Sequence, residues 1–427
     1  MRFLWALCVM ALAPGALAEL QEVFAWKQVD FNFSNNSVRE EALKSGTYDP
    51  KQALPLGIAY YEGRVFISLP KWKAGTPATL TTVPFDAAKN TASSSPLLNP
   101  YPNWSWHQRP EGDCDGLTSV FRMEVDQCGR LWVLDSGLEK VALGGKQVCP
   151  PQLLIFDLKS DTLLRRYRFP KTSLKDNSFL TGLTLDVSGD QCNSEQDDAF
   201  AYIADVWAFG MIAYSFKDDR SYRVEHPYFL PDPLACEFNA GGIDFKWIDG
   251  LFGMALTPLD KNNPLNRTLY FHPMSSFHEF SVPTHILRNE TAAGEPGDAF
   301  KVLAERRGRK LSQASASAMS KEGILLYNLV SRNAIGCWNT HQPHYEGLCG
   351  TLYQDDEKLS LPNDLTIDDN NVWVLSDRLH KYLYKELSPE EVNFRVLRGD
   401  IIKDVKGTSC DPEYIPKPEE LQPKCVP

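Results

Sequence analysis

Residues 120–136 read VFRMEVDQCGRLWVLDS, which is a short apolar run, a polar turn and a second apolar run that reaches Asp135. Short apolar runs separated by turn residues predict β-strands. Five other stretches have the same order, and they begin at Gly57, Gly182, Gly250, Ser315 and Asp364. In all six stretches the second run is followed by a polar residue, and these are Ser68, Asp135, Asp205, His272, Asn328 and Ser376.

The repeat has a nearly regular period. The successive differences between these six residue numbers are 67, 70, 67, 56 and 48. Repeated strand units of this size predict an all-β fold, a six-bladed β-propeller with a central channel, because neighbouring blades must stack to form a core. Two β-sandwich domains would be the alternative, but they require a linker near the middle of the chain, and none is evident.

A propeller also needs its ring to be closed. Residues 23–33, VFAWKQVDFNF, form an early strand that belongs to none of the six units. We expect this strand to pair beside residues 392–397 in the last blade, because the pairing joins two free strand edges.

Helical periodicity is confined to residues 37–45 and a short stretch at residues 388–392.

The 427 residues carry 44 Lys and Arg against 55 Asp and Glu, a net charge of −11. An acidic chain disfavours a nucleic-acid partner or an anionic membrane surface. Residues 1–18 have the positive start, apolar run and Ala-x-Ala end of a secretory signal peptide. We therefore expect a secreted, extracellular protein with one propeller domain at residues 19–410 and a flexible tail at residues 411–427.

The cysteines and sequons agree with secretion. Of the 10 cysteines, Cys8 lies in the signal peptide, and an oxidising compartment favours disulfides among the others. Their odd number leaves at least one thiol unpaired or bonded to another molecule. Asn-x-Ser/Thr sequons predict glycosylation at five positions, which are Asn32, Asn35, Asn103, Asn266 and Asn289.

Some polar residues are candidates for a functional site. The six strand-end residues could surround the channel, but their regular recurrence favours a structural role in fixing turns and backbone N–H groups. Asp113 and Asp364 each precede an inner strand, where oxygen atoms would suit Ca²⁺, Mg²⁺ or an amine, although loop capping is the favoured interpretation. Trp338, Asn339 and Thr340 offer an aromatic ring and two hydrogen-bonding side chains, and they form the best single ligand candidate.

Longer motifs resemble the insect Yellow / major royal jelly protein family. They follow the family's order along nearly the whole mature chain, and they include WKQVDF (26–31), SLPKWKAGTPATL (68–80), LNPYPNWS (98–105), RLWVLDSG (130–137), IGCWN (335–339) and VNFRVLRG (392–399). The Lys-Trp-Lys at residues 71–73 is more similar to the Yellow branch. The resemblance implies a secreted six-bladed propeller, in agreement with the repeat.

The resemblance also implies disulfides and a ligand site. The family's common cysteines imply the pairs Cys114–Cys149 and Cys337–Cys410. Cys192–Cys236 is a looser pairing, while Cys128, Cys349 and Cys425 stay unassigned. The match of the Gly-Cys-Trp-Asn motif places Asn339 and Thr340 near the family's ligand site at one end of the channel, with Asn328 and Phe179 as further members.

Family members act in insect pigmentation and cuticle melanisation, convert dopachrome to dihydroxyindoles, bind biogenic amines or serve as nutrients. We therefore expect a secreted protein that binds a small aromatic ligand, derived from a catecholamine or an indole, in its channel and acts in melanin pigmentation or cuticle biology. A dopachrome isomerase is the alternative, and the base that tautomerisation needs would be His272, Asp113 or Asp364.

A third interpretation is a divalent-metal-dependent hydrolase similar to gluconolactonases, or a structural or storage protein without enzymatic activity. We expect no cofactor, no metal, no nucleic-acid partner and no membrane partner. The oligomeric state stays open at this point.

Overall fold

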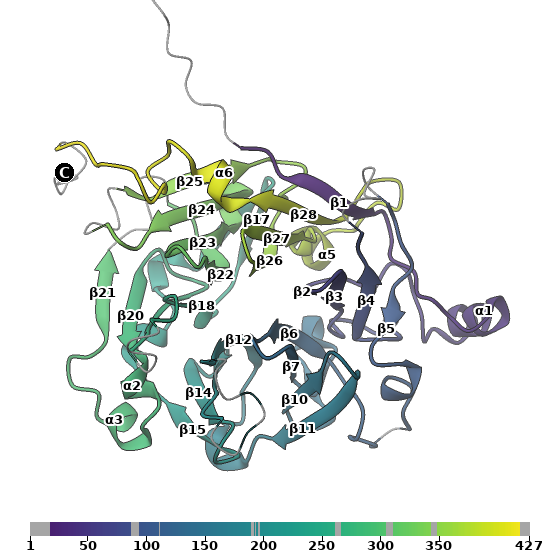
Figure 1. Ribbon diagram of the computed structural model, residues 1–427. Coiled ribbons are helices and arrows are strands. Elements are labelled where there is room, and N and C mark those ends of the chain that lie inside the picture. Colours follow the sequence, from purple (N-terminus) through teal and green to yellow (C-terminus); the bar gives the residue numbers. More distant parts are fainter. Residues whose placement is uncertain are drawn as a thin grey trace, which may run out of the picture.

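Six antiparallel sheets of four strands surround a central channel in the computed structural model (Figure 1). The structure describes residues 18–86, 94–110, 112–188, 192, 194, 197–260, 266–304, 311–342 and 348–418. This arrangement confirms the all-β, six-bladed propeller. Nearly all of the predicted signal peptide, the end of the predicted tail and Cys425 lie outside the described residues, so those predictions are untested.

Each predicted strand–turn–strand unit forms the two innermost strands of one blade. The first strands line the channel and contact one another around the ring; they are β2 (Ile58–Tyr61), β6 (Val120–Val125), β12 (Leu180–Asp186), β18 (Leu251–Leu256), β22 (Ala314–Met319) and β26 (Pro362–Asp368). The second strands are β3 (Arg64–Ser68), β7 (Arg130–Asp135), β13 (Phe200–Asp205), β19 (Thr268–Pro273), β23 (Ile324–Leu329) and β27 (Asn371–Ser376).

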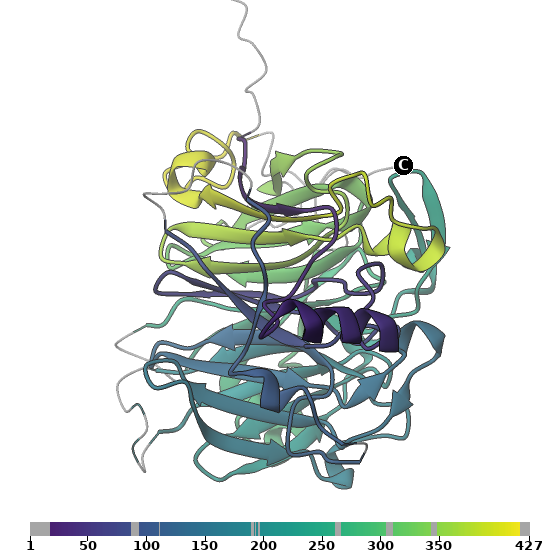
Figure 2. The ribbon, with the colours of Figure 1, turned by 90° about the vertical axis from the view of Figure 1, so that its right-hand side faces the viewer.

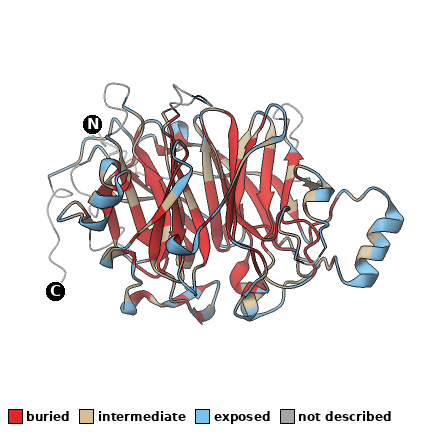
Figure 3. Ribbon diagram, turned by 90° about the horizontal axis from the view of Figure 1, so that it is seen from below, coloured by how far each residue is buried: buried red, intermediate tan, exposed pale blue. Residues whose placement is uncertain are grey.

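The outer strands complete the blades. Those of the first five blades are β4 (Leu80–Pro84) and β5 (Asn99–Pro100), β10 (Gln152–Asp157) and β11 (Thr162–Arg168), β14 (Gly210–Ser215) and β15 (Arg220–Val224), β20 (Glu279–Pro283) and β21 (Lys301–Ala304), and β24 (Ala334–Asn339) and β25 (Gly350–Gln354). Within the part of the chain that the structure describes, two hairpins lie outside the blades: β8 (Leu138–Glu139) with β9 (Lys146–Gln147), and β16 (Glu237–Ala240) with β17 (Ile243–Lys246). The hydrophobic core fills the spaces between blades, and the exposed segments gather at the two faces and the rim (Figure 3).

The ring closes by the predicted pairing, although the early strand ends at Trp26 and does not extend to residue 33. Strand β1 (Gln21–Trp26) pairs antiparallel with β28 (Phe394–Asp400) and becomes the outermost strand of the sixth blade (Figure 1). Trp26 is buried there, and Glu22 forms an ion pair with Arg395 at 2.8 Å. The first blade is therefore held to the last by hydrogen bonds between the two ends of the chain.

Helix α1 (Asn36–Ser45) confirms the prediction for residues 37–45. It projects from the side of the ring (Figure 1), lies in front of the blades when that side faces the viewer (Figure 2), and has no buried residue. The predicted helix at residues 388–392 is wrong, because the Asn393 side chain donates to the carbonyls of Lys27 and Ser388 and holds a turn there. The other short α-helices within the described residues are α2 (Thr284–Leu287), α3 (Glu290–Gly294), α5 (Leu379–Tyr384) and α6 (Ile401–Val405). Among the described helices, none has the length and apolarity that a membrane span requires.

Two of the polar residues at the strand ends hold the backbone where an inner strand begins. Asp135 accepts hydrogen bonds from the backbone N–H groups of Thr118 and Ser119, each at 2.8 Å. Ser68 accepts from Gly57 N at 2.8 Å and donates to Phe121 O at 2.7 Å in the next blade. Asp135 and Ser68 therefore help to set where their inner strands begin, as the structural interpretation predicts.

Three disulfides are present among the described residues. Cys114–Cys149 and Cys337–Cys410 are confirmed. The looser pairing of Cys192 with Cys236 is wrong, since Cys192 bonds to Cys128. Cys128 lies in the β6–β7 turn, beside the connection that follows β12, whereas the thiol of Cys236 contacts Asp232 O at 3.3 Å in a separate loop.

All five sequon asparagines are exposed. Asn35, Asn103 and Asn289 use their side-chain oxygen to cap a helix, so their amide nitrogen does not take part in the cap. Glycosylation at the five positions stays a prediction.

Candidate functional site

The channel holds two cavities that share the side chains of Arg122 and Phe252. We call the cavity of about 250 Å³, at the face where the inner strands begin, the aromatic pocket. We call the cavity of about 180 Å³, toward the opposite ends of these strands, the polar pocket. The Arg122 guanidinium lies 5.7 Å from the Phe252 ring centroid, so the pair separates the two cavities.

β-Bulges build the inner wall of the aromatic pocket. Five inner strands shift register near their first residues, and one residue inside each shift lines this pocket; the five are Phe121, Thr181, Phe252, Ser315 and Asn363. A bulge leaves one residue out of the ladder and re-aims its side chain, which is common beside active sites. The pocket is thus a consequence of the same irregularity repeated around the ring.

Aromatic rings form a continuous part of that wall. The ring centroids of Trp72 and Phe121 are 5.5 Å apart, those of Phe121 and Phe179 4.7 Å, and those of Phe179 and Trp207 4.3 Å. Asp205 at the end of β13 accepts from Phe179 N at 2.8 Å and so fixes this group. A cavity of about 150 Å³ accommodates benzene, so the aromatic pocket is large enough for a bicyclic aromatic ligand.

Two segments outside the inner strands contribute a second aromatic group. Trp247 follows β17 and Tyr384 ends α5, and both line the pocket. The Trp247 indole N–H donates to the Tyr384 hydroxyl at 2.7 Å, and Phe245 stacks on Tyr384 at 5.2 Å between centroids. This contact joins two segments that are 137 residues apart in the sequence.

Asp249 is the acidic residue of the aromatic pocket. Burial raises the pKa of its carboxyl group to about 7, and a hydrogen bond from the Trp207 side chain partly opposes the shift. A carboxyl group that is half ionised near neutral pH can both accept and return a proton. Its position among aromatic rings also suits it to contact a cationic aromatic ligand.

Arg122 forms the floor of the aromatic pocket. Its guanidinium donates to Asn363 O at 3.0 Å and to Asn363 Oδ1 at 2.8 Å, and it lies 3.4 Å from the Asp364 carboxylate. Asn363 in turn donates to Asp377, whose pKa burial raises to about 8. The cation is therefore held in one orientation by hydrogen bonds to Asn363 and by its ion pair with Asp364.

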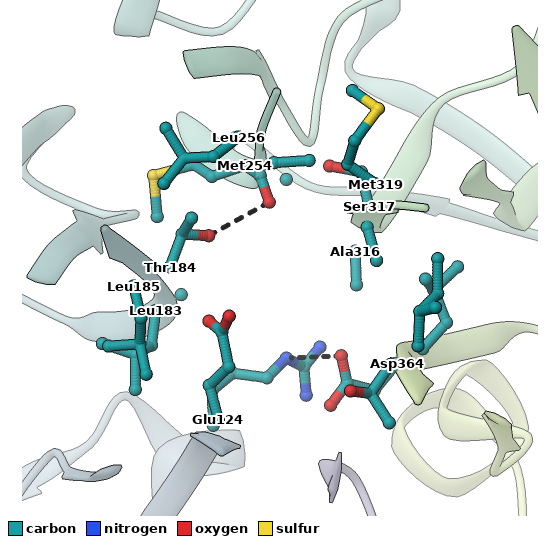
Figure 4. Close-up of a pocket in the computed structure, with 18 of the residues that line it drawn as sticks. Glu124, Leu183, Thr184, Leu185, Met254, Leu256, Ala316, Ser317, Met319 and Asp364 are labelled. Carbon is teal, nitrogen blue, oxygen red and sulfur yellow. Dashed lines mark hydrogen bonds and ion pairs between the residues drawn. The ribbon is translucent and has the colours of Figure 1, made fainter. Parts of the chain in front are cut away.

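The polar pocket contains Glu124, Asp364, Arg122 and Arg267. Figure 4 shows the Glu124 carboxyl group pointing into this cavity. Burial raises the pKa of Glu124 to about 8, although the charge of Arg267 opposes the shift. Within the described parts of the chain, no three His, Cys, Asp or Glu side chains gather as a metal would require.

Two of the residues predicted from the sequence lie in these cavities. Phe179 lines the aromatic pocket and Asp364 lines the polar pocket, where it also accepts from Ile58 N at 2.8 Å. Asp113 lies outside both cavities, in the loop beside the Cys114 disulfide, and forms an ion pair with Arg109 at 3.5 Å.

The other predicted residues also lie outside both cavities. His272 is fully buried between Glu279 at 3.0 Å and Ser315 O at 2.8 Å. Asn328 is buried in β23, the second strand of its blade. Asn339 ends the third strand of that blade and donates to Asp411 O at 3.2 Å, and Thr340 donates to Gly323 O at 2.7 Å.

The position of Asn339 within its blade explains why this residue lies outside both cavities. Its motif lies on β24, which is two strands away from the channel, and Cys337 of the same motif forms a disulfide. The motif therefore carries packing and cross-linking. Sequence reasoning missed Trp72, Asp249 and Tyr384, although Trp72 is the centre of the Lys-Trp-Lys motif and Asp249 directly precedes the fourth repeat.

Comparison with known proteins gives consistent matches. The model of the family described as major royal jelly protein matches residues 118–410. A protein of Drosophila melanogaster named dopaminechrome tautomerase is 39% identical over 406 residues, which cover 93% of this chain and 85% of that protein. Protein yellow of the same species is 40% identical over 400 residues, which cover 93% and 71%. Among solved structures, virginiamycin B lyase from Staphylococcus aureus aligns with 89% of this chain and 98% of that chain at 12% identity and a TM-score of 0.42, and no functional argument follows from it.

Proposed function

This chain belongs to the major royal jelly protein family, and from that premise we propose that it binds an aminochrome in its aromatic pocket and tautomerises it to a dihydroxyindole. An aminochrome is the bicyclic quinone that forms from an oxidised catecholamine. The observation that carries the proposal is the position of Asp249, the acidic side chain among the aromatic and aliphatic residues that line this pocket, where burial raises the pKa of its carboxyl group to about 7. The relative named for such a reaction is 39% identical, and the Yellow relatives favour a role in pigmentation or cuticle biology.

The reaction needs only proton transfers. Two protons leave carbons of the five-membered ring and two protons arrive at the quinone oxygens, with no net change in atoms or electrons. Asp249 is the proposed base, since a base works best when its pKa is near the working pH. Arg122 on the floor is the proposed cation that stabilises negative charge as it develops on oxygen.

The same pocket supports a second candidate, binding of a biogenic amine without turnover. Aromatic rings and a carboxylate attract an ammonium group on an aromatic body, and these are the chemical groups that the pocket offers. Three disulfides favour an extracellular location for either function. Secretion, glycosylation and the role in pigmentation are parts of the proposal.

Absorbance measurements test the proposal. We would add purified full-length protein to dopaminechrome and compare its decay with the spontaneous rate, using Asp249→Asn as the test variant. Asp113→Asn is the matched control, because Asp113 lies outside both cavities. We expect faster decay with the wild type and the control, a dihydroxyindole product, and loss of the effect in Asp249→Asn.

Calorimetry with dopamine on the same batch separates the two candidates. Dopamine binding without any acceleration of dopaminechrome decay would replace tautomerisation by amine binding. The absence of both signals would reject the aromatic pocket as a site for this class of ligand.

A further inference from the structure

Two polar atoms of the aromatic pocket have no hydrogen-bond partner within the described residues. One is the Thr181 hydroxyl, whose residue is 5% exposed, and the other is the Trp72 indole nitrogen. Buried polar groups in native proteins are nearly always paired, because an unpaired one loses its hydrogen bonds to water without replacement. A molecule that enters the pocket is the natural source of the missing partners.

Thr181 differs in its hydrogen bonding from the other polar residues at the bulges. Three of the five are polar, and two of these are satisfied within the protein: Ser315 donates to Pro362 O at 2.9 Å, and Asn363 binds Arg122 and Asp377. Thr181 occupies the same place in its strand and has no such partner. The fold therefore turns this hydroxyl toward the cavity without using it to hold neighbouring blades together.

Trp72 belongs to the same part of the wall. Its ring packs edge-on against Phe121 at 5.5 Å, and Phe121 packs against Phe179, which lies two residues before Thr181. An indole N–H only donates, so its partner must be an acceptor such as an oxygen atom and not an ammonium group. A threonine hydroxyl donates and accepts, so it suits both a quinone oxygen and a catechol hydroxyl.

We infer that Trp72 and Thr181 hold the oxygen substituents of the aromatic ligand, whereas Asp249 takes its nitrogen-bearing part. The inference rests on the proposed function. It adds that the pocket selects ligands whose aromatic ring carries oxygen atoms. Water alone would satisfy the same two atoms without any preference among ligands. The preference between two ligands that differ only in these oxygens is therefore the property to measure.

Dopamine and phenethylamine are suitable probes, because phenethylamine is the same amine without the two ring hydroxyls. We would measure both affinities by calorimetry for the wild type, Thr181→Val and Trp72→Phe. Each variant is expected to weaken dopamine binding about fivefold, as the loss of one neutral hydrogen bond does, and to leave phenethylamine binding unchanged. The melting temperature of the ligand-free Thr181→Val protein should not fall, because no internal bond is removed.

Thr184→Val is the matched control. Its hydroxyl lies in the polar pocket and donates to Met254 O at 3.1 Å (Figure 4), so the substitution should lower the melting temperature and leave both affinities unchanged. Equal losses for dopamine and phenethylamine would overturn the inference, since they would indicate general damage to the wall. Unchanged dopamine affinity in both variants would also overturn it, while dopaminechrome turnover by the wild type would leave the proposed function standing. A wild type that neither binds dopamine nor converts dopaminechrome would overturn both.

Discussion

Asp249 in the aromatic pocket and Glu124 in the polar pocket are carboxyl groups whose pKa values burial raises, to about 7 and about 8. They lie on opposite sides of Arg122 and Phe252 in the same channel. The two groups call for different measurements. The ionised form of Asp249 is the proposed base, whereas ionisation of Glu124 only adds a charge to a confined space.

The pH dependence of turnover is the first prediction at this scale. Because Asp249 must lose its proton to act as a base, kcat/KM for dopaminechrome should rise as the pH passes through about 7. At one pH unit below the pKa the rate should be about one tenth of its plateau. Initial rates between about pH 5.5 and 8.5, corrected for spontaneous decay, would show this. A flat profile would assign the reaction to another group.

Glu124 predicts a pH dependence of stability with the opposite sense. Its folded-state pKa lies above the ordinary value of 4.5, so its contribution is fully present below about pH 4.5 and is lost as the pH rises through about 8. Glu124→Gln removes this loss. We expect the variant to match the wild type near pH 5 and to exceed it by about 2–4 kcal/mol near pH 9, since each pKa unit is worth about 1.4 kcal/mol.

Urea unfolding at the two pH values would measure the difference for Glu124→Gln. Glu40→Gln on the exposed helix α1 is the control and should show none. Equal destabilisation of Glu124→Gln at both pH values would mean that Glu124 contributes through packing or hydrogen bonding and not through its charge.

Single residues of the site were the least predictable feature of the sequence. Phe179 was found through its place in the repeat, but Trp72 and Asp249 were not. Periodicity predicts which residues alternate between the two faces of a strand, and the bulges interrupt that alternation where the pocket forms. The motif at Asn339 lies on β24, the third strand of its blade, so the ligand role predicted for Asn339 stays a prediction.

At the scale of elements, hairpin β16–β17 and helix α5 meet over the aromatic pocket through Trp247 and Tyr384. Tyr384 is 42% exposed, so the contact lies at the mouth of the pocket. Neither element is part of a blade, and neither is long enough for its periodicity to stand out in the sequence. The strand–turn–strand unit was predictable because it occurs six times in the sequence, whereas hairpin β16–β17 and helix α5 each occur once.

Tyr384→Phe tests whether this contact retains the ligand. The substitution removes the acceptor of the Trp247 N–H and keeps the ring that stacks on Phe245. We expect dopamine to dissociate about threefold to tenfold faster, because a hydrogen bond worth about 1 kcal/mol no longer closes the mouth. Stopped-flow tryptophan fluorescence would measure the rate.

The control for this element is Tyr382→Phe. The Tyr382 hydroxyl donates to Gln52 O at 3.1 Å and lines neither cavity, so its loss should leave the dissociation rate unchanged. Equal rates for wild type and Tyr384→Phe would mean that the ligand leaves without separating the hairpin from the helix.

At the scale of the whole molecule, the six-bladed ring follows directly from the sequence, including its closure by the early strand. Because neighbouring blades must stack, six units with an unpaired strand edge at each end of the chain allow few arrangements other than a closed ring. The division of the channel into two cavities was not predictable. It depends on Arg122 and Phe252, which belong to the second and fourth blades and meet in the channel.

Ring closure predicts how far the loss of stability caused by one substitution extends through the molecule. In an open repeat array each unit depends mainly on its neighbours, whereas a closed ring has no free end from which to unravel. Trp26 on β1 is 1% exposed, and its indole N–H donates to Pro96 O at 2.9 Å. Trp26→Ala should therefore cost about 3–5 kcal/mol, the usual cost of removing a buried aromatic side chain, and the loss should reach blades that do not touch β1.

Native-state hydrogen exchange would measure the loss of stability at strand β12, which lies in the third blade and opposite β1 around the ring. If closure couples all six blades, the slowest amides of β12 should exchange faster in Trp26→Ala by the full change in global stability. Val38→Ala on the exposed helix α1 provides the comparison and should leave the exchange unchanged. Acceleration confined to β28, with β12 still protected as in the wild type, would show instead that β1 only covers the edge of the sixth blade and that the other blades hold the pocket without it.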